Sequence, residues 1–152
     1  DVNGIKVRAF SKSHDAFDPV SYCVEAGGKR LGVITDIGYG CKNVVEQISQ
    51  CDSLILEANH DINMLKNGPY PAYLKKRIAS KYGHISNYEA ALLVLSCASK
   101  NLQSIMLSHL SQNNNTPEVA LSTFDLLKER KDIQPKVCLS LREMPSEYVV
   151  VK

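Results

Sequence analysis

Residues 52–87 read DSLILEANHDINMLKNGPYPAYLKKRIASKYGHISN, and no other segment says more about the architecture. The segment opens with the apolar run 54–56, which is typical of a buried strand. The run stops at 57–61, EANHD, where four of the five side chains can ionise or form hydrogen bonds. Strands that end in such clusters build sites in α/β proteins, because the strand fixes the backbone while the loop aims the side chains. The segment therefore predicts an α/β fold with a functional site at a strand end.

Strand and helix patterns continue on both sides of this segment. Patterns of apolar residues predict strands at 5–10, 20–26, 30–35, 54–56, 104–107, 136–141 and 148–151. Helical patterns cover 44–48, 61–66, 71–81, 87–99 and 116 to about 131. Ser86 and Glu89 form a capping box at the start of the helix 87–99, which is so rich in Ala, Leu and Val that we expect it to be largely buried.

Composition places the chain among ordinary globular proteins. It has 152 residues, 44% of them hydrophobic and 22% charged, which suits a single domain with one core. The net charge of +2 neither requires nor excludes a nucleic acid partner. The five cysteines show no metal or redox spacing, which predicts reduced thiols in a cytoplasmic protein. No apolar run approaches the ~18 residues that span a bilayer and no signal peptide is visible, so no membrane association is expected.

Three of the four histidines lie at or just beyond the end of a predicted strand: His14, His60 and His109. Asp36 also follows a strand. Strands that finish on one edge of a sheet bring such side chains together. Imidazoles and a carboxylate at such a rim make a zinc-type site, in which Asp36 could bridge two ions. Taken alone, the spacing leaves open that these are unrelated polar loop residues.

The order of the motifs resembles the second half of the metallo-β-lactamase fold. The motifs are SHDAFDP (13–19), VITDIGYG (33–40), LEANHD (56–61), GHISN (83–87) and SHLS (108–111). The similarity is greatest to the phosphodiesterase and nuclease branch, particularly to bacterial WalJ (YycJ)-like proteins, and it covers essentially the whole chain. It implies half of an αββα sandwich, with a mixed sheet and helices packed on one face.

The resemblance also implies roles for individual residues. His14 and His109 match metal ligands of the family, and Asp36 matches the aspartate that bridges two metal ions. His84 matches the histidine that, in related nucleases, helps to protonate the leaving oxygen. In the complete enzyme this implies two divalent ions, zinc or manganese, acting on a phosphodiester.

Four further residues are implied to support His84 or bind substrate. Asn59, His60 and Asp61 fall where related tRNA-processing enzymes carry a supporting His-Glu-Ala-Thr element. Asp61 could instead cap the helical turn that follows, which would make its pairing with His60 structural. Ser86 starts a helix whose N-terminus, next to His84, is a natural place for a phosphate.

The first signature of the family, His-x-His-x-Asp-His, does not occur in the chain. The resemblance therefore predicts that residues 1–152 form one domain, the C-terminal half of the fold, and that the N-terminal half was removed or lies on another chain. The implied function is a metal-dependent phosphodiester hydrolase directed at DNA or RNA. This chain would supply part of the dinuclear site, hold at most one ion weakly, and be inactive alone.

Two other functions stay open. One is a hydrolase of the same superfamily that acts on a small ester, lactone or thioester. The other is a non-catalytic scaffold whose uncovered sheet face binds a partner chain or a second copy. A basic stripe could follow a nucleic acid backbone or could be only the solvated face of a helix; it consists of Lys75, Lys76, Arg77 and Lys81.

Overall fold

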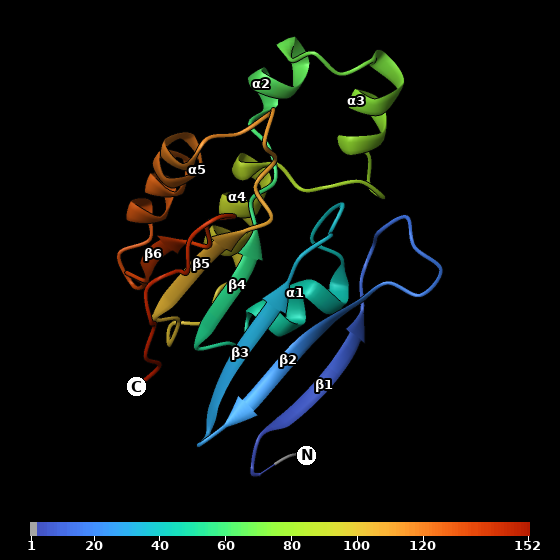
Figure 1. Cartoon of the computed structure of the whole chain (residues 1–152). Helices are drawn as coiled ribbons and strands as arrows, with labels where there is room; N and C mark the ends of the chain where they lie inside the picture. Colours follow the sequence, from blue (N-terminus) through green and yellow to red (C-terminus); the bar gives the residue numbers. More distant parts are fainter. Residues whose placement is uncertain (1–2) are drawn as a thin grey trace.

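The computed structural model describes residues 3–152 and contains one six-stranded mixed sheet, in which the strands lie side by side in sequence order (Figure 1). The strands are β1 (Lys6–Ser11), β2 (Val20–Ala26), β3 (Lys29–Ile34), β4 (Ser53–Glu57), β5 (Ser104–Ser108) and β6 (Lys136–Leu139). β2 is antiparallel to β1 and β3, and β3 to β6 are mutually parallel. Consequently β1, β3, β4 and β5 run in one direction and end at the same edge of the sheet.

Five α-helices and one 3₁₀-helix connect the strands: α1 (Lys42–Ile48), α2 (Ile62–Asn67), α3 (Ala72–Ile78), α4 (Asn87–Cys97), α5 (Pro117–Thr123) and η1 (Phe124–Glu129). Helices α1, α4 and α5 pack against one face of the sheet, through contacts with β3, β4 and β6 respectively. Helices α2 and α3 stand beyond the end of β4, at the edge where the parallel strands finish (Figure 1). The predicted α/β architecture, a mixed sheet with helices on one face, is confirmed.

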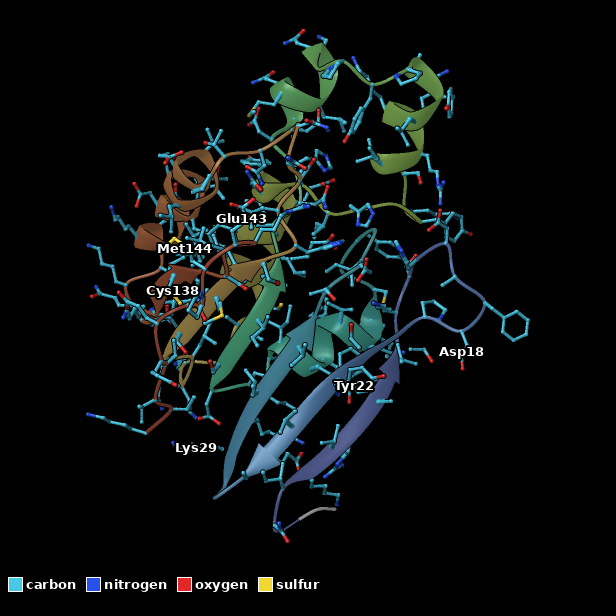
Figure 2. The ribbon with its side chains drawn as sticks, viewed as in Figure 1. Asp18, Tyr22, Lys29, Cys138, Glu143 and Met144 are labelled. Carbon is cyan, nitrogen blue, oxygen red and sulfur yellow. The ribbon has the colours of Figure 1, made fainter. Side chains whose placement is uncertain are left out.

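Strand register explains why the two faces of the sheet differ. Successive side chains of a strand point to opposite faces. On the helix-covered face, Leu54 pairs with Ile105, and both are fully buried in the core. On the other face, Ile55 pairs with Met106, and both remain half-buried. The apolar row on this second face runs across five strands, and its two ends, Tyr22 and Cys138, are labelled in Figure 2; it consists of Tyr22, Val33, Ile55, Met106 and Cys138.

Several sequence predictions need correction. Residues 148–151 form no strand, and the side chain of Tyr148 is fully exposed. Nearby, the backbone of Lys152 bonds to the side chain of Gln103. The helix predicted for 71–81 ends at Ile78, and the one predicted for 116–131 gives way to 3₁₀ geometry after Thr123. The hydroxyl of Thr123 donates to the carbonyl of Val119 within that helix, a contact that competes with regular helical bonding.

Helix α4 is less buried than its composition predicted. Ala90, Ala91 and Val94 are buried in the core, but Tyr88 and Leu92 are 48% and 38% exposed. The capping box at its start is present: Ser86 accepts from the Glu89 backbone N–H, and the Glu89 carboxylate accepts from the Ser86 backbone. The predicted start of the helix is therefore confirmed, whereas its outer face is open.

All five cysteines are free. Among residues 3–152, no helix combines the length and the apolar character that crossing a membrane requires.

Candidate metal centre

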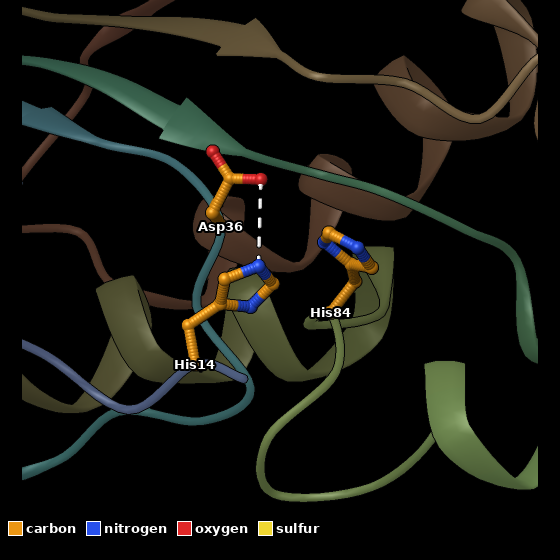
Figure 3. Close-up of side chains that lie close together, drawn as sticks. All are labelled: His14, Asp36 and His84. Atoms are coloured by element: carbon orange, nitrogen blue, oxygen red, sulfur yellow. Dashed lines mark ion pairs between the residues drawn. The ribbon is translucent and has the colours of Figure 1, made fainter. Parts of the chain in front are cut away.

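The side chains singled out from the sequence converge where β1, β3, β4 and β5 end. His14 follows β1, Asp36 follows β3, and His109 follows β5 directly. Nε2 of His14 lies 3.9 Å from Oδ1 of Asp36, and Nε2 of His109 lies 3.7 Å from the same oxygen. Figure 3 shows His14 and Asp36 facing each other, with His84 beside them. Segments that are far apart in the sequence thus meet at one carboxylate.

His84 reaches the same place from the loop between α3 and α4. Its ring centroid lies 5.1 Å from that of His14 and 5.2 Å from that of His109. The loop is held by the bond from the His84 backbone N–H to the carbonyl of Ile78 and by the bond from the Asn59 N–H to the carbonyl of Ile85. His84 therefore stands between the other two imidazoles.

The loops that carry Asp36 and His84 pack closely against the backbone of neighbouring segments at two glycines. A Cβ on Gly38 would lie 2.1 Å from the carbonyl oxygen of Lys81, and one on Gly83 would lie 2.2 Å from the carbonyl oxygens of Arg77 and Ile78. Only glycine fits such positions. The two glycines let the loop that carries Asp36 and the loop that carries His84 pack against their neighbours.

Two of the converging residues have unusual backbone conformations. Asp36 has φ +54° and His109 has φ +56°, in the left-handed region that residues other than glycine seldom adopt. Each residue comes just after a strand, where this conformation turns the chain sharply. Strain of this kind persists where surrounding structure over-determines it, which is common at functional sites.

Glu57 belongs to the polar cluster 57–61 that the sequence indicated, but no role in the site was predicted for it. It is the last residue of β4 and is 0% exposed. Its Oε1 accepts from Nδ1 of His84 and from Nδ1 of His109, both at 2.7 Å, and its Oε2 accepts from the Ile37 backbone N–H at 2.7 Å. One buried carboxylate thus orients two imidazoles and a backbone amide. The signal in the sequence was a glutamate that directly ends an apolar run.

In His14, His84 and His109, hydrogen bonds at one ring nitrogen determine which nitrogen remains available to bind a metal. Nδ1 of His14 lies 3.0 Å from the carbonyl of Gly83, to which it can only donate. Since Nδ1 of His84 and His109 donates to Glu57, Nε2 is the nitrogen left to accept in all three rings. Metal-binding histidines are typically oriented in this way, by an acceptor at the other ring nitrogen.

The charges around the site are mutually stabilising. Burial works to raise the pKa of Glu57, but the hydrogen bonds from His109, His84 and the Ile37 amide outweigh it and lower that pKa. The hydrogen bond to Glu57 raises the pKa of His109 despite partial burial. Burial also works to raise the pKa of Asp36, yet His109 and other nearby groups hold it below its usual value. Both carboxylates are therefore charged at neutral pH.

A lysine that sequence reasoning also missed adds a cation to this environment. Lys12 donates from Nζ to the carbonyl of Thr35 at 2.5 Å. Burial lowers the pKa of Lys12, while the charges of Asp36 and Glu57 act in the opposite direction. The alternation of the first strand gave no sign that this lysine would lie beside two carboxylates.

Of the other four residues predicted to support the site or bind substrate, Asn59, His60 and Asp61 follow β4, and Ser86 lies two residues after His84. The Asn59 amide donates to the carbonyl of His109 at 2.9 Å, and Asp61 caps α2 by accepting from the N–H of Met64. Ser86 caps α4. His60 is 2% exposed, and its Nδ1 has no hydrogen-bond partner among the described residues. The rings of His84 and His109 donate instead to the carboxylate of Glu57.

Burial of His60 predicts a pH effect on stability. Burial lowers the pKa of His60 below its ordinary 6.5, so the unfolded chain takes up a proton there more readily than the folded one. Stability supplied by neutral His60 is present above pH 6.5 and is lost as the pH falls towards the lowered pKa. In thermal melts with EDTA, His60→Gln should lose less stability than the wild type between pH 7.5 and pH 5. Parallel curves for the two proteins would contradict this.

Comparison with solved structures defines the class of fold. The chain superposes on the metallo-β-lactamase fold protein YhfI from Bacillus subtilis with a TM-score of 0.64 and 13% identity, covering 92% of this chain and 47% of that one. It matches Zn²⁺-bound PqqB from Methylobacterium extorquens (TM-score 0.57, 18% identity, 91% and 45% covered). Human tRNase Z, short form, gives a TM-score of 0.57 at 20% identity, with 95% and 42% covered. The chain has the metallo-β-lactamase fold over roughly half of each of these proteins.

Sequence relatives are more specific. "Exodeoxyribonuclease YycJ" of Bacillus anthracis is 37% identical over 127 residues, which is 83% of this chain and 48% of that protein. "Exodeoxyribonuclease WalJ" of Streptococcus pneumoniae is 35% identical over 119 residues, 78% of this chain and 44% of that protein. No family model matches the chain. The chain is homologous to the YycJ and WalJ exodeoxyribonucleases, and it spans about half the length of these relatives.

Proposed function

We propose that this chain forms part of a metal-dependent DNA exonuclease, with His14, Asp36 and His109 as metal ligands. The convergence of two imidazole nitrogens on one Asp36 oxygen, at 3.9 and 3.7 Å, is the observation that carries the proposal. Homology to proteins named exodeoxyribonucleases supports DNA as the substrate. The free cysteines support a reducing compartment, and we place the protein in the cytoplasm.

The donor types suit a divalent ion, and among residues 3–152 the donor atoms that already lie within 4.8 Å of one another are those of His14, Asp36 and His84 and those of Glu57, His84 and His109. Two imidazoles and a carboxylate, each imidazole with Nδ1 engaged and Nε2 free, are ligands that suit zinc and also manganese. Glu57 lies close to His84 and His109 as well, but its oxygens already accept three N–H groups, so we assign it to orienting the rings and not to the metal. When bound, the ions would lower the pKa of a water molecule and stabilise negative charge on the phosphate.

His84 is proposed to hold a proton for the leaving oxygen. Its Nδ1 is engaged by the Glu57 carboxylate at 2.7 Å, so the ring presents Nε2 to the site. Departure of an alkoxide from phosphorus is easier when a positioned acid supplies its proton.

We further propose that this chain holds only part of a dinuclear centre. Two zinc ions with about four ligands each need more groups than two histidines and a shared aspartate supply, even counting water. Residues outside this chain would complete the set, and the chain alone would be inactive. The half-buried apolar row from Tyr22 to Cys138 is where we expect the completing half, or a second copy, to pack, since Tyr22 is 44% exposed there.

A substrate screen tests the proposed activity. The protein joined to the residues that complete the site is loaded with Zn²⁺ or Mn²⁺ and assayed on single- and double-stranded DNA, RNA, and small esters, lactones and thioesters. The proposal expects release of mononucleotides from DNA that EDTA abolishes. Hydrolysis of the small esters with no cleavage of DNA would refute the proposal in favour of the other enzyme class.

A further inference from the structure

A hollow opens beside the histidines, between α3 and the loop that follows β5. It has a volume of about 440 Å³, within the range of about 300–1,000 Å³ typical of small-molecule sites. His84 and His109 form the wall nearest the candidate metal centre. A ligand in the hollow would therefore have one end at the imidazoles.

The lining of the hollow combines an apolar wall with polar edges. Leu74 and Ile78 come from α3, and Leu110 comes from the loop after β5. Tyr70 and Asn113 also line the hollow, and the Asn113 amide donates to the Tyr70 hydroxyl at 3.0 Å. An apolar wall next to amide and hydroxyl groups suits a flat heteroaromatic ring with polar edges.

Two arginines and one carboxylate, Asp15, line the same hollow. Arg77 and Arg142 both line it. Asp15 accepts from Nε of Arg77 at 2.6 Å and lies 2.5 Å from its Nη2. This pairing orients the guanidinium, and Nη1 is the nitrogen that Asp15 does not contact. Residues 62–88, which include α2 and α3, contain five cations and no carboxylate: Lys66, Lys75, Lys76, Arg77 and Lys81. Because Asp15 occupies Nε and Nη2, Arg77 offers Nη1 for a charge-assisted hydrogen bond to a phosphate oxygen.

We infer that this hollow binds the terminal nucleotide of the DNA strand, with its base on the apolar wall. The inference rests on the proposed function, which puts the scissile phosphate at the histidines. From there the nucleoside extends over Leu74 and Ile78, its edge meets Asn113 and Tyr70, and Arg77 and Arg142 bind phosphate oxygens. The ligand class is a deoxynucleoside monophosphate, free or at the end of a strand.

The test is calorimetric titration of the metal-free protein, in EDTA, with dAMP, deoxyadenosine and inorganic phosphate. The inference expects dAMP to bind at least about tenfold more tightly than phosphate. Arg77→Ala and Arg142→Ala should each weaken dAMP binding by about tenfold or more, because each removes a charge-assisted hydrogen bond.

Lys76→Ala is the matched control, because Lys76 adjoins Arg77 in α3 but does not line the hollow. It should change the affinity by less than about twofold. Asn113→Ala should weaken binding of dAMP but not of phosphate. Equal losses for Lys76→Ala and both arginine variants, or equal affinity for dAMP and phosphate, would overturn the inference. Melting curves of each variant establish that a lost affinity is not lost folding.

This outcome is separable from that of the proposed function, because nucleotide binding is measured without metal or turnover. If dAMP binds as expected but the metal-loaded protein cleaves no DNA, the hollow is a nucleotide site and the proposed activity is wrong. If DNA is cleaved but dAMP binds no better than phosphate, only the nucleotide site is wrong.

Discussion

Asp36→Asn should reduce metal-dependent DNA hydrolysis by at least about 10³-fold in the protein that contains the completed site. Asparagine keeps the shape of aspartate and tolerates the φ of +54° at this position, so the substitution removes charge with little disturbance of the backbone. The carboxylate lies within 4 Å of Nε2 of both His14 and His109. Charge stabilisation by a bound metal is worth several kcal/mol, which corresponds to a factor of about 10³ in rate.

The same substitution at Asp125 is the control. Asp125 is an exposed aspartate of η1 that pairs with Lys128, away from the ends of the parallel strands. Asp125→Asn should leave the rate within about twofold of the wild type. An Asp36→Asn protein that keeps its bound metal and more than a tenth of the activity would show that Asp36 does not bridge or bind the ions.

Glu57→Gln should damage both stability and metal affinity. All three partners of this carboxylate are N–H donors, so any orientation of a glutamine places its NH₂ group against a donor. One buried donor left without an acceptor costs about 1–3 kcal/mol. If the imidazoles respond by moving their proton to Nε2, they lose the lone pair that a metal needs. Loss of such an orienting carboxylate typically lowers metal affinity by 10–100-fold, about 1.4–2.7 kcal/mol.

Urea unfolding of the metal-free protein and zinc titration with a competing chelator measure these two effects separately. Glu46→Gln changes the net charge equally at an exposed position of α1 and should alter neither quantity. Glu57→Gln with unchanged zinc affinity would mean that Glu57 does not orient ligands, even if the variant were less stable.

Local patterns in the sequence were sufficient for much of the fold. The strand predicted at 20–26 matches β2, because its apolar pattern ends in two glycines that turn the chain. The start of α4 was predictable because a capping box is a contact within four residues. The segment 148–151 was wrongly predicted as a strand. A run of β-branched residues forms a strand only where it can pair with the edge of a sheet and pack against neighbouring side chains.

For the candidate site, the sequence indicated which side chains lie at one edge of the sheet. It did not indicate which of them contact one another. The positions of His14, Asp36 and His109 after strands indicated one common edge, because parallel strands end together. The role of Glu57 was hidden, since it depends on His84, His109 and Ile37, which approach it from three other segments. The hollow beside α3 was equally hidden, because its walls come together only in the folded chain.

Anomalous diffraction at the zinc edge, from crystals grown with Zn²⁺, tests most directly whether residues 14, 36 and 109 share an ion. The account predicts a peak bonded by Nε2 of His14, a carboxylate oxygen of Asp36 and Nε2 of His109, each at about 2.0–2.2 Å. A peak coordinated by Glu57, or zinc bound only elsewhere on the protein, would contradict it.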